Sequence, residues 1–479
     1  MNAPRRFSIR THGCQMNVHD SQKVSNLLHH EGWSAADTAD SADLLIINTC
    51  SIRDKAEHRL YSELGKLRRW KDAQPGRIIG VAGCVAQQQG DALLRRFSQL
   101  DFVYGTHNLR RVPSMVEAAL RGHRASETDE SSTHQRFDLP APHPDLAVDP
   151  DGRAYVTVME GCDMFCSFCI VPFTRGREIS RHADAIVAEA RELVDRGVRE
   201  VTLLGQTVNA YGRHALRRAG AAGGALPHDV IGFADLLAEL DAIPGLRRLR
   251  YISPHPVFFD ETLIRAHGEL ESLCPHVHLP AQAGSDRLLE RMRRRYTADD
   301  YRQLVDRLRD SRPDLAITTD LIVGFPGETD ADFEETLGLV RDIGFTDSFI
   351  FKYSPRPNTT AAQMQGSVGA DVAQQRLEQL QDLQRLLTLA AHRSRLGERT
   401  QVLVEGVSRR GGSQRVGRDP YNRVVNFSIG PDDSSEQRAE PGRLLDVDLV
   451  DATPHSLIGE PVSARGRALS RLDDDRHLN

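Results

Sequence analysis

Short apolar runs alternate with helical patterns along the first part of the chain. The apolar runs occupy residues 7–13, 43–49 and 77–83. Helical periodicity follows them, as in residues 20–30 and 54–70. Strands that alternate with helices in this way form a parallel sheet with crossover helices. We therefore expect residues 1–122 to fold as an α/β domain.

The same alternation returns after an interruption. Residues 126–151 are rich in Ser, Pro, Asp and His and lack apolar periodicity, which predicts a linker over residues 123–151. Residues 152–389 then form a second α/β core, with strand-like runs at 154–158, 200–204, 248–252, 276–279, 316–320 and 348–352. Six strands are too few for a complete eight-stranded barrel. Residues 372–396 have helical periodicity, and their end at 390–396 bridges to the last domain.

The last domain, residues 397–463, has the period-two pattern of strands. Residues 401–406 and 444–450 alternate in this way, with Gly and Pro between them, which predicts a small β-barrel before a tail at 464–479. Arginines lie beside Tyr421 in its middle: Arg409, Arg410, Arg415, Arg418 and Arg423. This mixture suits phosphate contacts and base stacking in RNA, although a solvated basic face has the same pattern.

Composition limits the setting in which the protein works. The net charge is −6, so RNA binding must depend on local basic patches. Further candidates for such patches are Arg291, Arg293, Arg294 and Arg295, and Lys66, Arg68, Arg69 and Lys71. An ordinary exposed helix face is the alternative for each set. No run approaches the roughly 18 apolar residues of a membrane span, and the amino terminus has no apolar signal region. We expect a soluble, cytoplasmic protein that does not bind a membrane.

Three of the seven cysteines form a compact motif after the strand-like run at 154–158. Cys162, Cys166 and Cys169 have the spacing C-x3-C-x2-C. Three thiolates can hold three irons of a 4Fe–4S cube and leave the fourth iron open, whereas electron-transfer clusters have four protein ligands. A zinc knuckle is the alternative, but it needs a fourth ligand nearby, and the next histidine is His182.

Three further cysteines share a position relative to the predicted strands. Cys14, Cys50 and Cys84 each follow an apolar run, and about 35 residues, close to one βαβ unit, separate neighbours. Because the carboxyl ends of parallel strands lie on one edge of a sheet, the three sulfurs are expected to converge there. The alternative is three unrelated buried cysteines. Cys274 belongs to neither set and is expected to be a small buried residue.

These motifs together resemble the methylthiotransferase family of radical S-adenosylmethionine enzymes. The resemblance is carried by THGCQMN (11–17), NTC (48–50), GCVAQ (83–87), CDMFCSFC (162–169), LLGQ (203–206), HLP (278–280) and DLIVGFPGET (320–329). It covers nearly the whole chain. Thr207 stands where the family usually has Asn, Ala281 where Val is usual and Asn358 where Gly is usual; none of these departures replaces a cysteine.

The resemblance implies a fold and a set of cofactors. The fold is an amino-terminal parallel α/β sheet domain, a partial (β/α)6 radical S-adenosylmethionine barrel and a TRAM domain, which is a small RNA-binding β-barrel. One 4Fe–4S cluster is implied on Cys14, Cys50 and Cys84, and a second, which coordinates S-adenosylmethionine, on Cys162, Cys166 and Cys169. The implied contacts to S-adenosylmethionine are Phe168, Gly205, Gln206, Gly324, Gly327 and Glu328. An ordinary strand-to-helix turn also explains the glycines at 324 and 327.

The resemblance also implies an activity. The motifs QMN (15–17) and GQTVN (205–209) favour family members that methylthiolate C2 of N(6)-dimethylallyladenosine beside the anticodon of tRNA. Sister enzymes that act on threonylcarbamoyl-adenosine or on a ribosomal-protein aspartate are the alternative. A non-catalytic iron–sulfur protein would leave the open iron positions without a purpose. The implied partners are that tRNA, a low-potential electron donor of the flavodoxin or ferredoxin type and a sulfur donor, with the enzyme itself a monomer.

Overall fold

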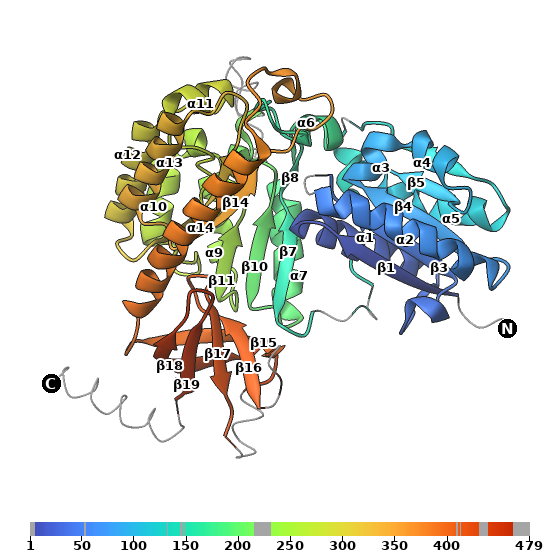
Figure 1. Cartoon of the computed structure of the whole chain (residues 1–479). Helices are drawn as coiled ribbons and strands as arrows, with labels where there is room; N and C mark the ends of the chain where they lie inside the picture. Colours follow the sequence, from blue (N-terminus) through green and yellow to red (C-terminus); the bar gives the residue numbers. More distant parts are fainter. Residues whose placement is uncertain are drawn as a thin grey trace, which may run out of the picture.

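The structure, a computed structural model, describes residues 5–51, 54–131, 133–143, 146, 149–214, 231–408, 411, 413–430 and 439–462. Three bodies follow one another along the chain (Figure 1). An α/β domain lies beside a larger barrel of strands and helices, and a small β-barrel lies at one end of the larger one. Among the described residues, no helix is long and apolar enough to cross a membrane.

The amino-terminal domain is built on a parallel sheet with strand order β2-β1-β3-β4-β5-β6. The strands are β1 (Arg6–His12), β2 (Ser34–Ala35), β3 (Leu44–Thr49), β4 (Ile78–Gly83), β5 (Phe102–Tyr104) and β6 (Ala125–Glu127). Every residue of β3 and β4 is buried, as expected of central parallel strands covered on both faces. The parallel α/β sheet predicted from the alternating pattern is therefore confirmed.

Helices cover both faces of this sheet. Helices α1 (Gln15–His30) and α5 (Val112–Leu120) pack on one face, against Leu44 and Ile46. Helices α2 (Asp54–Asp72), α3 (Cys84–Gln89) and α4 (Asp91–Arg96) pack on the other, against Leu45 and Ile47. Strand β6 and the short helix η3 (His134–Phe137) fall within residues 123–151, the range that we expected to be a linker.

The central barrel is made of two parallel sheets. One has the order β11-β10-β7, and the other β12-β13-β14. The strands are β7 (Arg153–Thr157), β10 (Glu200–Leu204), β11 (Arg248–Tyr251), β12 (His276–His278), β13 (Ala316–Val323) and β14 (Asp347–Lys352). A parallel bridge between Leu249 and Leu273 joins the sheets. Within the described residues β7 and β14 are edge strands, so the barrel is open between them.

Helices surround the barrel and share its core. They are α7 (Ala183–Asp195), α9 (Phe233–Asp241), α10 (Glu261–Glu269), α11 (Asp286–Arg291), α12 (Ala298–Ser311), α13 (Asp330–Ile343) and α14 (Ala370–Arg393). The short elements β8 (Met159–Glu160), α6 (Val171–Thr174) and β9 (Ile179–Ser180) lie between β7 and α7. The long helix α14 leads from the barrel to the carboxyl-terminal domain (Figure 1).

The carboxyl-terminal domain is a closed barrel with strand order β15-β16-β17-β19-β18. Its strands are β15 (Arg399–Val407), β16 (Gln414–Arg418), β17 (Val424–Ser428), β18 (Leu444–Ala452) and β19 (Leu457–Pro461). Alternate residues such as Val402, Val404, Val425 and Phe427 fill its interior. The predicted small β-barrel is confirmed.

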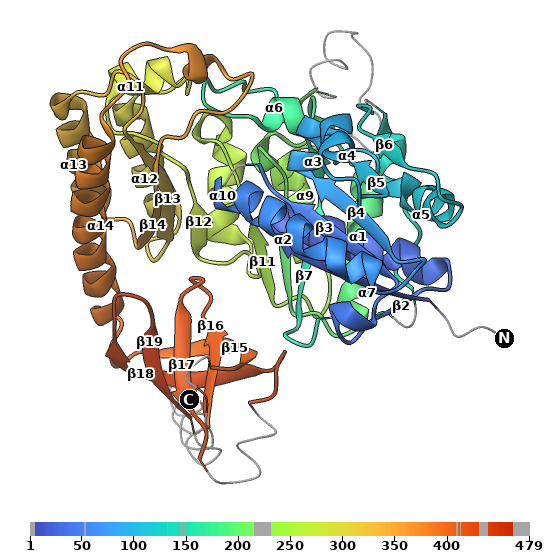
Figure 2. The ribbon, with the colours of Figure 1, turned by 45° about the vertical axis from the view of Figure 1, so that its right-hand side comes forward.

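The small barrel lies at the amino ends of β7, β10 and β11 (Figures 1 and 2), and two buried arginines of β11 fix it there. Arg248 donates to the backbone oxygens of Arg418 (2.9 Å) and Gln401 (2.5 Å). Arg250 donates to the backbone oxygen of Asp419 at 3.0 Å. Both guanidinium groups face the carboxylate of Glu200, at 3.7 and 3.1 Å. The small barrel therefore sits at the end of the central barrel opposite the carboxyl ends of its strands.

Candidate active site

The structure brings the thiols of Cys14, Cys50 and Cys84 together. Cys14 is the N-cap of α1, Cys50 follows β3 and Cys84 begins α3. The strands end in register, because His12 pairs with Thr49, and Thr49 with Gly83. Hydrogen bonding to Cys50 lowers the pKa of Cys14 to about 6 and that of Cys84 to about 7. The same hydrogen bonds and burial raise the pKa of Cys50, so Cys14 and Cys84 are the two thiols that this edge favours as thiolates, the form that binds metal.

An amide network holds the loop of Cys14. The Asn17 side-chain oxygen accepts from the backbone N–H of Cys14 (3.3 Å) and from its thiol (3.4 Å). The Asn17 amide donates to Asn48 at 3.0 Å, and Asn48 donates back to the Asn17 backbone oxygen at 2.9 Å. A Cβ on Gly83, where φ is +90°, would lie 2.4 Å from the Asn48 side-chain oxygen. The motif residues around the cysteines thus fix where the thiols lie.

The second triplet lies in the loop after β8. Cys162 and Cys166 are buried, and Cys169 is half-buried. Met164, Phe168, Val257 and Phe258 pack around them. Burial raises the pKa of the Cys162 and Cys169 thiols, so they need a bound cation or a nearby positive charge to become thiolates.

A zinc ion would need a compact set of four ligands. The four ligands of one zinc ion lie about 4 Å or less from one another, given metal–ligand distances near 2.0–2.3 Å. In the described part of the chain, the group with ligand atoms within 4.8 Å of one another is Asp163, Glu178 and His214, and it contains no cysteine. The described residues therefore give the zinc alternative at Cys162, Cys166 and Cys169 no fourth ligand in a compact set.

Two residues contact the second triplet without having been predicted to do so. The Thr207 hydroxyl lies 3.0 Å from the Cys162 sulfur. Arg294 donates to the Cys166 sulfur at 3.5 Å and to the Pro280 backbone oxygen at 3.0 Å. Arg294 is only 6% exposed, so its assignment to a surface patch for RNA was wrong. Thr207 was visible in the sequence only as a departure from the family, and no pattern distinguished Arg294 from its neighbours.

Three of the residues expected to contact S-adenosylmethionine lie around the cysteine loop. Gln206 accepts a hydrogen bond from the Gly161 N–H at 2.5 Å. A Cβ on Gly205 would lie 2.7 Å from the Met159 side chain, so the glycine permits a close approach to β8. Phe168 packs on Cys162, Met164 and Cys166. Direct contact of these residues with S-adenosylmethionine stays a prediction.

The other three residues expected to contact S-adenosylmethionine, Gly324, Gly327 and Glu328, lie in the turn after β13. Gly324 and Gly327 have φ of +73° and +83°, which favours glycine. The Glu328 carboxylate accepts from the Gly324 N–H (2.6 Å) and from Arg376 (2.8 Å) and therefore braces the turn. Burial raises the pKa of Glu328. Its other oxygen is buried and, among the described residues, has no hydrogen-bond partner.

The arginines of the small barrel occupy different settings. Arg409 and Arg410 lie outside the described residues, and Arg415 is half-buried on β16. Arg418 pairs with Glu405 at 2.9 Å. The Arg423 guanidinium lies 5.1 Å from the Tyr421 ring centre, and the Tyr421 hydroxyl donates to Asp314 on the central barrel at 2.6 Å. Arg418 and Tyr421 thus take part in packing within the protein, and RNA contacts by this set stay a prediction.

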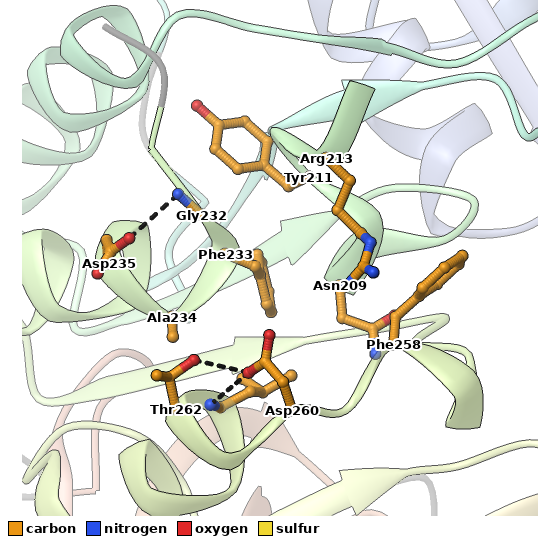
Figure 3. A pocket seen from close by; sticks show the side chains of 11 residues that line it. Asn209, Tyr211, Arg213, Gly232, Phe233, Ala234, Asp235, Phe258, Asp260 and Thr262 are labelled. Carbon is orange, nitrogen blue, oxygen red and sulfur yellow. Dashed lines mark hydrogen bonds between the residues drawn. The ribbon is translucent and has the colours of Figure 1, made fainter. Parts of the chain in front are cut away.

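A separate pocket of about 290 Å³ lies at the amino ends of α9 and α10 (Figure 3). Its lining includes Asn209, Tyr211, Arg213, Phe258 and Asp260. Phe258 also packs against Cys162, Met164 and Cys166, so this ring contacts both the pocket and the cysteine loop. Asp260 and Asp235 cap the helices at the pocket wall, as the dashed lines in Figure 3 show, and are already hydrogen-bonded.

Comparisons with known proteins agree with this three-part division. Residues 6–105 match the model of the uncharacterized protein family UPF0004, residues 156–340 the radical SAM superfamily and residues 393–462 the TRAM domain. A radical S-adenosylmethionine methyltransferase from Kitasatospora setae has a similar fold, with a TM-score of 0.50 and 15% identity over 75% of this chain and 74% of that chain. The fold and the two cysteine sites define a three-domain protein of the radical S-adenosylmethionine superfamily.

Curated relatives narrow this class to one family. A tRNA-2-methylthio-N(6)-dimethylallyladenosine synthase from Geobacter metallireducens is 47% identical over 96% of this chain and 99% of its own length. Proteins of the same name from Geobacter sulfurreducens and a Jannaschia species are each 43% identical, over 96% of this chain and 98% and 94% of theirs. The chain belongs to the family of tRNA-2-methylthio-N(6)-dimethylallyladenosine synthases.

Proposed function

We propose that the protein replaces the C2 hydrogen of N(6)-dimethylallyladenosine in tRNA by a methylthio group. The observation that carries this proposal is the presence of two separate sets of three thiols in one molecule, Cys14, Cys50 and Cys84 on one domain and Cys162, Cys166 and Cys169 on another. One such set suffices to activate S-adenosylmethionine. A second set, on another domain, indicates that a second ligand, here sulfur, is also delivered.

The chemistry explains why such cofactors are needed. The C2–H bond of adenine has no acidity that a general base could use, so its replacement requires a radical. When bound, the two 4Fe–4S clusters and S-adenosylmethionine supply the electron, the radical, the sulfur and the methyl group. The protein's task is to position these groups and to keep water away from them.

The residues around Cys162, Cys166 and Cys169 suit that task. Met164, Phe168 and Phe258 enclose the thiols in apolar surface. Arg294 offsets the cost of buried negative charge at Cys166 by a charge-assisted hydrogen bond. The Thr207 hydroxyl can donate to the Cys162 thiolate. Together these contacts stabilise the anionic ligands in a site that excludes water.

The small barrel supports an RNA substrate. It matches the TRAM domain, and Arg415 with Arg409 and Arg410 would contact tRNA phosphates. Because the small barrel is fixed to the amino ends of the barrel strands, the tRNA would span the central barrel while its modified loop reaches the cysteine loop at the opposite end. We place the enzyme in the cytoplasm as a monomer, with a flavodoxin- or ferredoxin-type electron donor and a separate sulfur donor.

Nucleoside mass spectrometry tests this proposal. In tRNA from a deletion strain, 2-methylthio-N(6)-dimethylallyladenosine should disappear. N(6)-dimethylallyladenosine, which lacks the methylthio group, should accumulate in its place. Wild-type protein should restore it, and a variant with Cys162→Ala should not. Loss of methylthio-threonylcarbamoyl-adenosine instead would favour the sister activity, and unchanged tRNA nucleosides would contradict both tRNA activities.

A further inference from the structure

One loop connects the two cysteine sites. The loop runs from Gly161 to Arg177, and it is closed by a hydrogen bond from the Cys162 N–H to the Gly176 backbone oxygen at 3.1 Å. Its first half supplies Cys162, Cys166 and Cys169. Its second half lies against the amino-terminal domain, where α6 contacts α3, the helix that begins with Cys84.

The amino-terminal domain holds the second half of this loop by its backbone. The Thr106 hydroxyl donates to the Thr174 backbone oxygen at 2.6 Å, and the His107 ring nitrogen lies 2.8 Å from the Arg175 backbone oxygen. A Cβ on Gly176 would lie 2.8 Å from the His107 ring, so the two surfaces touch without space between them. The position of Arg175 is therefore set from both domains.

The Arg175 side chain enters the amino-terminal domain. Its Nη2 donates to Asp20 at 2.7 Å, and the two side chains are 3% and 5% exposed. Asp20 lies on α1, the helix whose N-cap is Cys14. Arg175 also follows α6, which packs on the helix that begins with Cys84, so its side chain lies beside the helices that start at two of the three cysteines.

The second terminal nitrogen of Arg175 is left without a partner. Its Nη1 is buried and, among the described residues, donates to no acceptor; Oδ1 of Asp20 is also buried and accepts from no donor there. A buried guanidinium N–H without an acceptor is costly, and native proteins seldom leave one unless a ligand or water completes it. Thiolates and the inorganic sulfurs of a cluster are suitable anionic acceptors, and hydrogen bonds to such sulfurs tune reduction potential.

We propose that Arg175 is a positioning residue shared by both cysteine sites, and that its Nη1 donates to the sulfur-bearing group held by Cys14, Cys50 and Cys84. The inference rests on the proposed cluster at these cysteines. Arg175 has two effects in this role. Its backbone fixes the loop of Cys162 relative to the other triplet, and its charge stabilises the reduced, more negative state of the group beside Cys14.

A redox titration tests the second effect. The full chain with Cys162, Cys166 and Cys169 changed to Ala is reconstituted anaerobically, so that iron binds at the amino-terminal triplet alone. The midpoint potential is then followed by electron paramagnetic resonance. Arg175→Gln should shift the reduction equilibrium at least tenfold towards the oxidised form, which is about 59 mV for one electron. Arg175→Lys keeps the charge and should recover most of the shift.

Arg136 offers a matched control at the same interface. It is also buried, at 8% exposure, and its side chain lies 3.4 Å from Glu160 and donates to the Glu160 backbone oxygen. Arg136→Gln also removes a buried arginine from this interface, and because Arg136 faces Glu160 and not the thiols, it should shift the midpoint potential much less than Arg175→Gln does. Equal potentials for the Arg175→Gln and Arg136→Gln proteins would overturn the inference. If Arg175→Gln binds no iron, Arg175→Lys decides. Iron retained in Arg175→Lys and in Arg136→Gln supports the inference, because the charge alone then restores the site. Loss of iron in Arg175→Lys, or loss in Arg136→Gln as well, overturns it.

The two proposals fail in different ways. The midpoint potential does not depend on any RNA substrate, so it can shift even if the wild-type protein makes no methylthio nucleoside. Conversely, a wild-type protein that makes the nucleoside, together with an unshifted potential in Arg175→Gln, would reject the role of Arg175 alone.

Discussion

Glu200 is the carboxylate that ion-pairs with both arginines that fix the small barrel, and its replacement by Gln should loosen that barrel. Glu200 is 3% exposed, and Arg248 and Arg250 beside it are 3% and 6% exposed. Glu200→Gln leaves both buried guanidinium groups without this ion-pair partner. Removing one partner from a buried ion pair costs about 3–5 kcal/mol. A free-energy change of about 1.36 kcal/mol corresponds to a tenfold change in an equilibrium constant. The equilibrium constant for docking of the small barrel should therefore fall by between about a hundredfold and a few thousandfold.

Amide hydrogen exchange measures this effect locally, which matters because a three-domain protein has no single unfolding free energy. Residues 248–251 and the turn at 418–423 should exchange faster in Glu200→Gln, whereas β3 and β4 should not change. Glu440→Gln is the control, since Glu440 pairs with Arg443 at 3.9 Å on the surface, where such pairs contribute about 0–1 kcal/mol. Equal exchange in the two variants would refute the argument that this buried carboxylate holds the domains together.

The pH dependence gives a second check on Glu200. Burial alone would raise the pKa of Glu200, but Arg250 and Arg248 hold it below its usual value. A lowered folded-state pKa means that the carboxylate stabilises the docked state fully above its unfolded pKa of about 4.3 and less as pH falls through the folded value. Wild-type docking should therefore weaken below about pH 4, and docking in Glu200→Gln should lack this transition.

Three further predictions concern the cofactors and the RNA. Anaerobically reconstituted protein should hold about eight irons, and changing Cys162, Cys166 and Cys169 to Ala should leave about four; full iron content would show that these cysteines are not ligands. Changing Cys14, Cys50 and Cys84 to Ala should abolish methylthio product but leave reductive formation of 5′-deoxyadenosine, and loss of both activities with the other cluster intact would reject this division. Changing Arg409, Arg410 and Arg415 to Gln should weaken tRNA binding. The slope of the logarithm of the binding constant against the logarithm of salt concentration should become shallower by about 0.7–0.9 per lost phosphate contact. An unchanged slope would mean that these arginines do not contact phosphates.

The convergence of Cys14, Cys50 and Cys84 could be predicted because it depends only on topology. Parallel strands with short apolar runs place their carboxyl ends on one edge, and a cysteine directly after each run must lie there. The strand boundaries predicted from the apolar runs agree with those of β7 and β10–β14 to within a few residues. Strand periodicity and length are local properties, so the sequence displays them directly.

Contacts made across long separations could not be predicted in this way. Arg294 lies in a run of arginines that looks like an exposed face, yet it bonds to Cys166, 128 residues away. Arg175 reaches Asp20 across 155 residues. Which arginine of a basic run turns inward depends on how the domains pack, and periodicity contains no information about that packing.

The way the small barrel is attached has a consequence for how this family can diversify. Arg248 and Arg250 donate to backbone oxygens of residues 401, 418 and 419. This part of the joint therefore depends on the backbone conformation of the small barrel and not on the identity of its side chains. Substitutions on the outer surface of the small barrel can therefore accumulate without loosening these bonds. An RNA-recognition surface attached in this manner is free to evolve new preferences while these backbone bonds to the catalytic barrel stay the same.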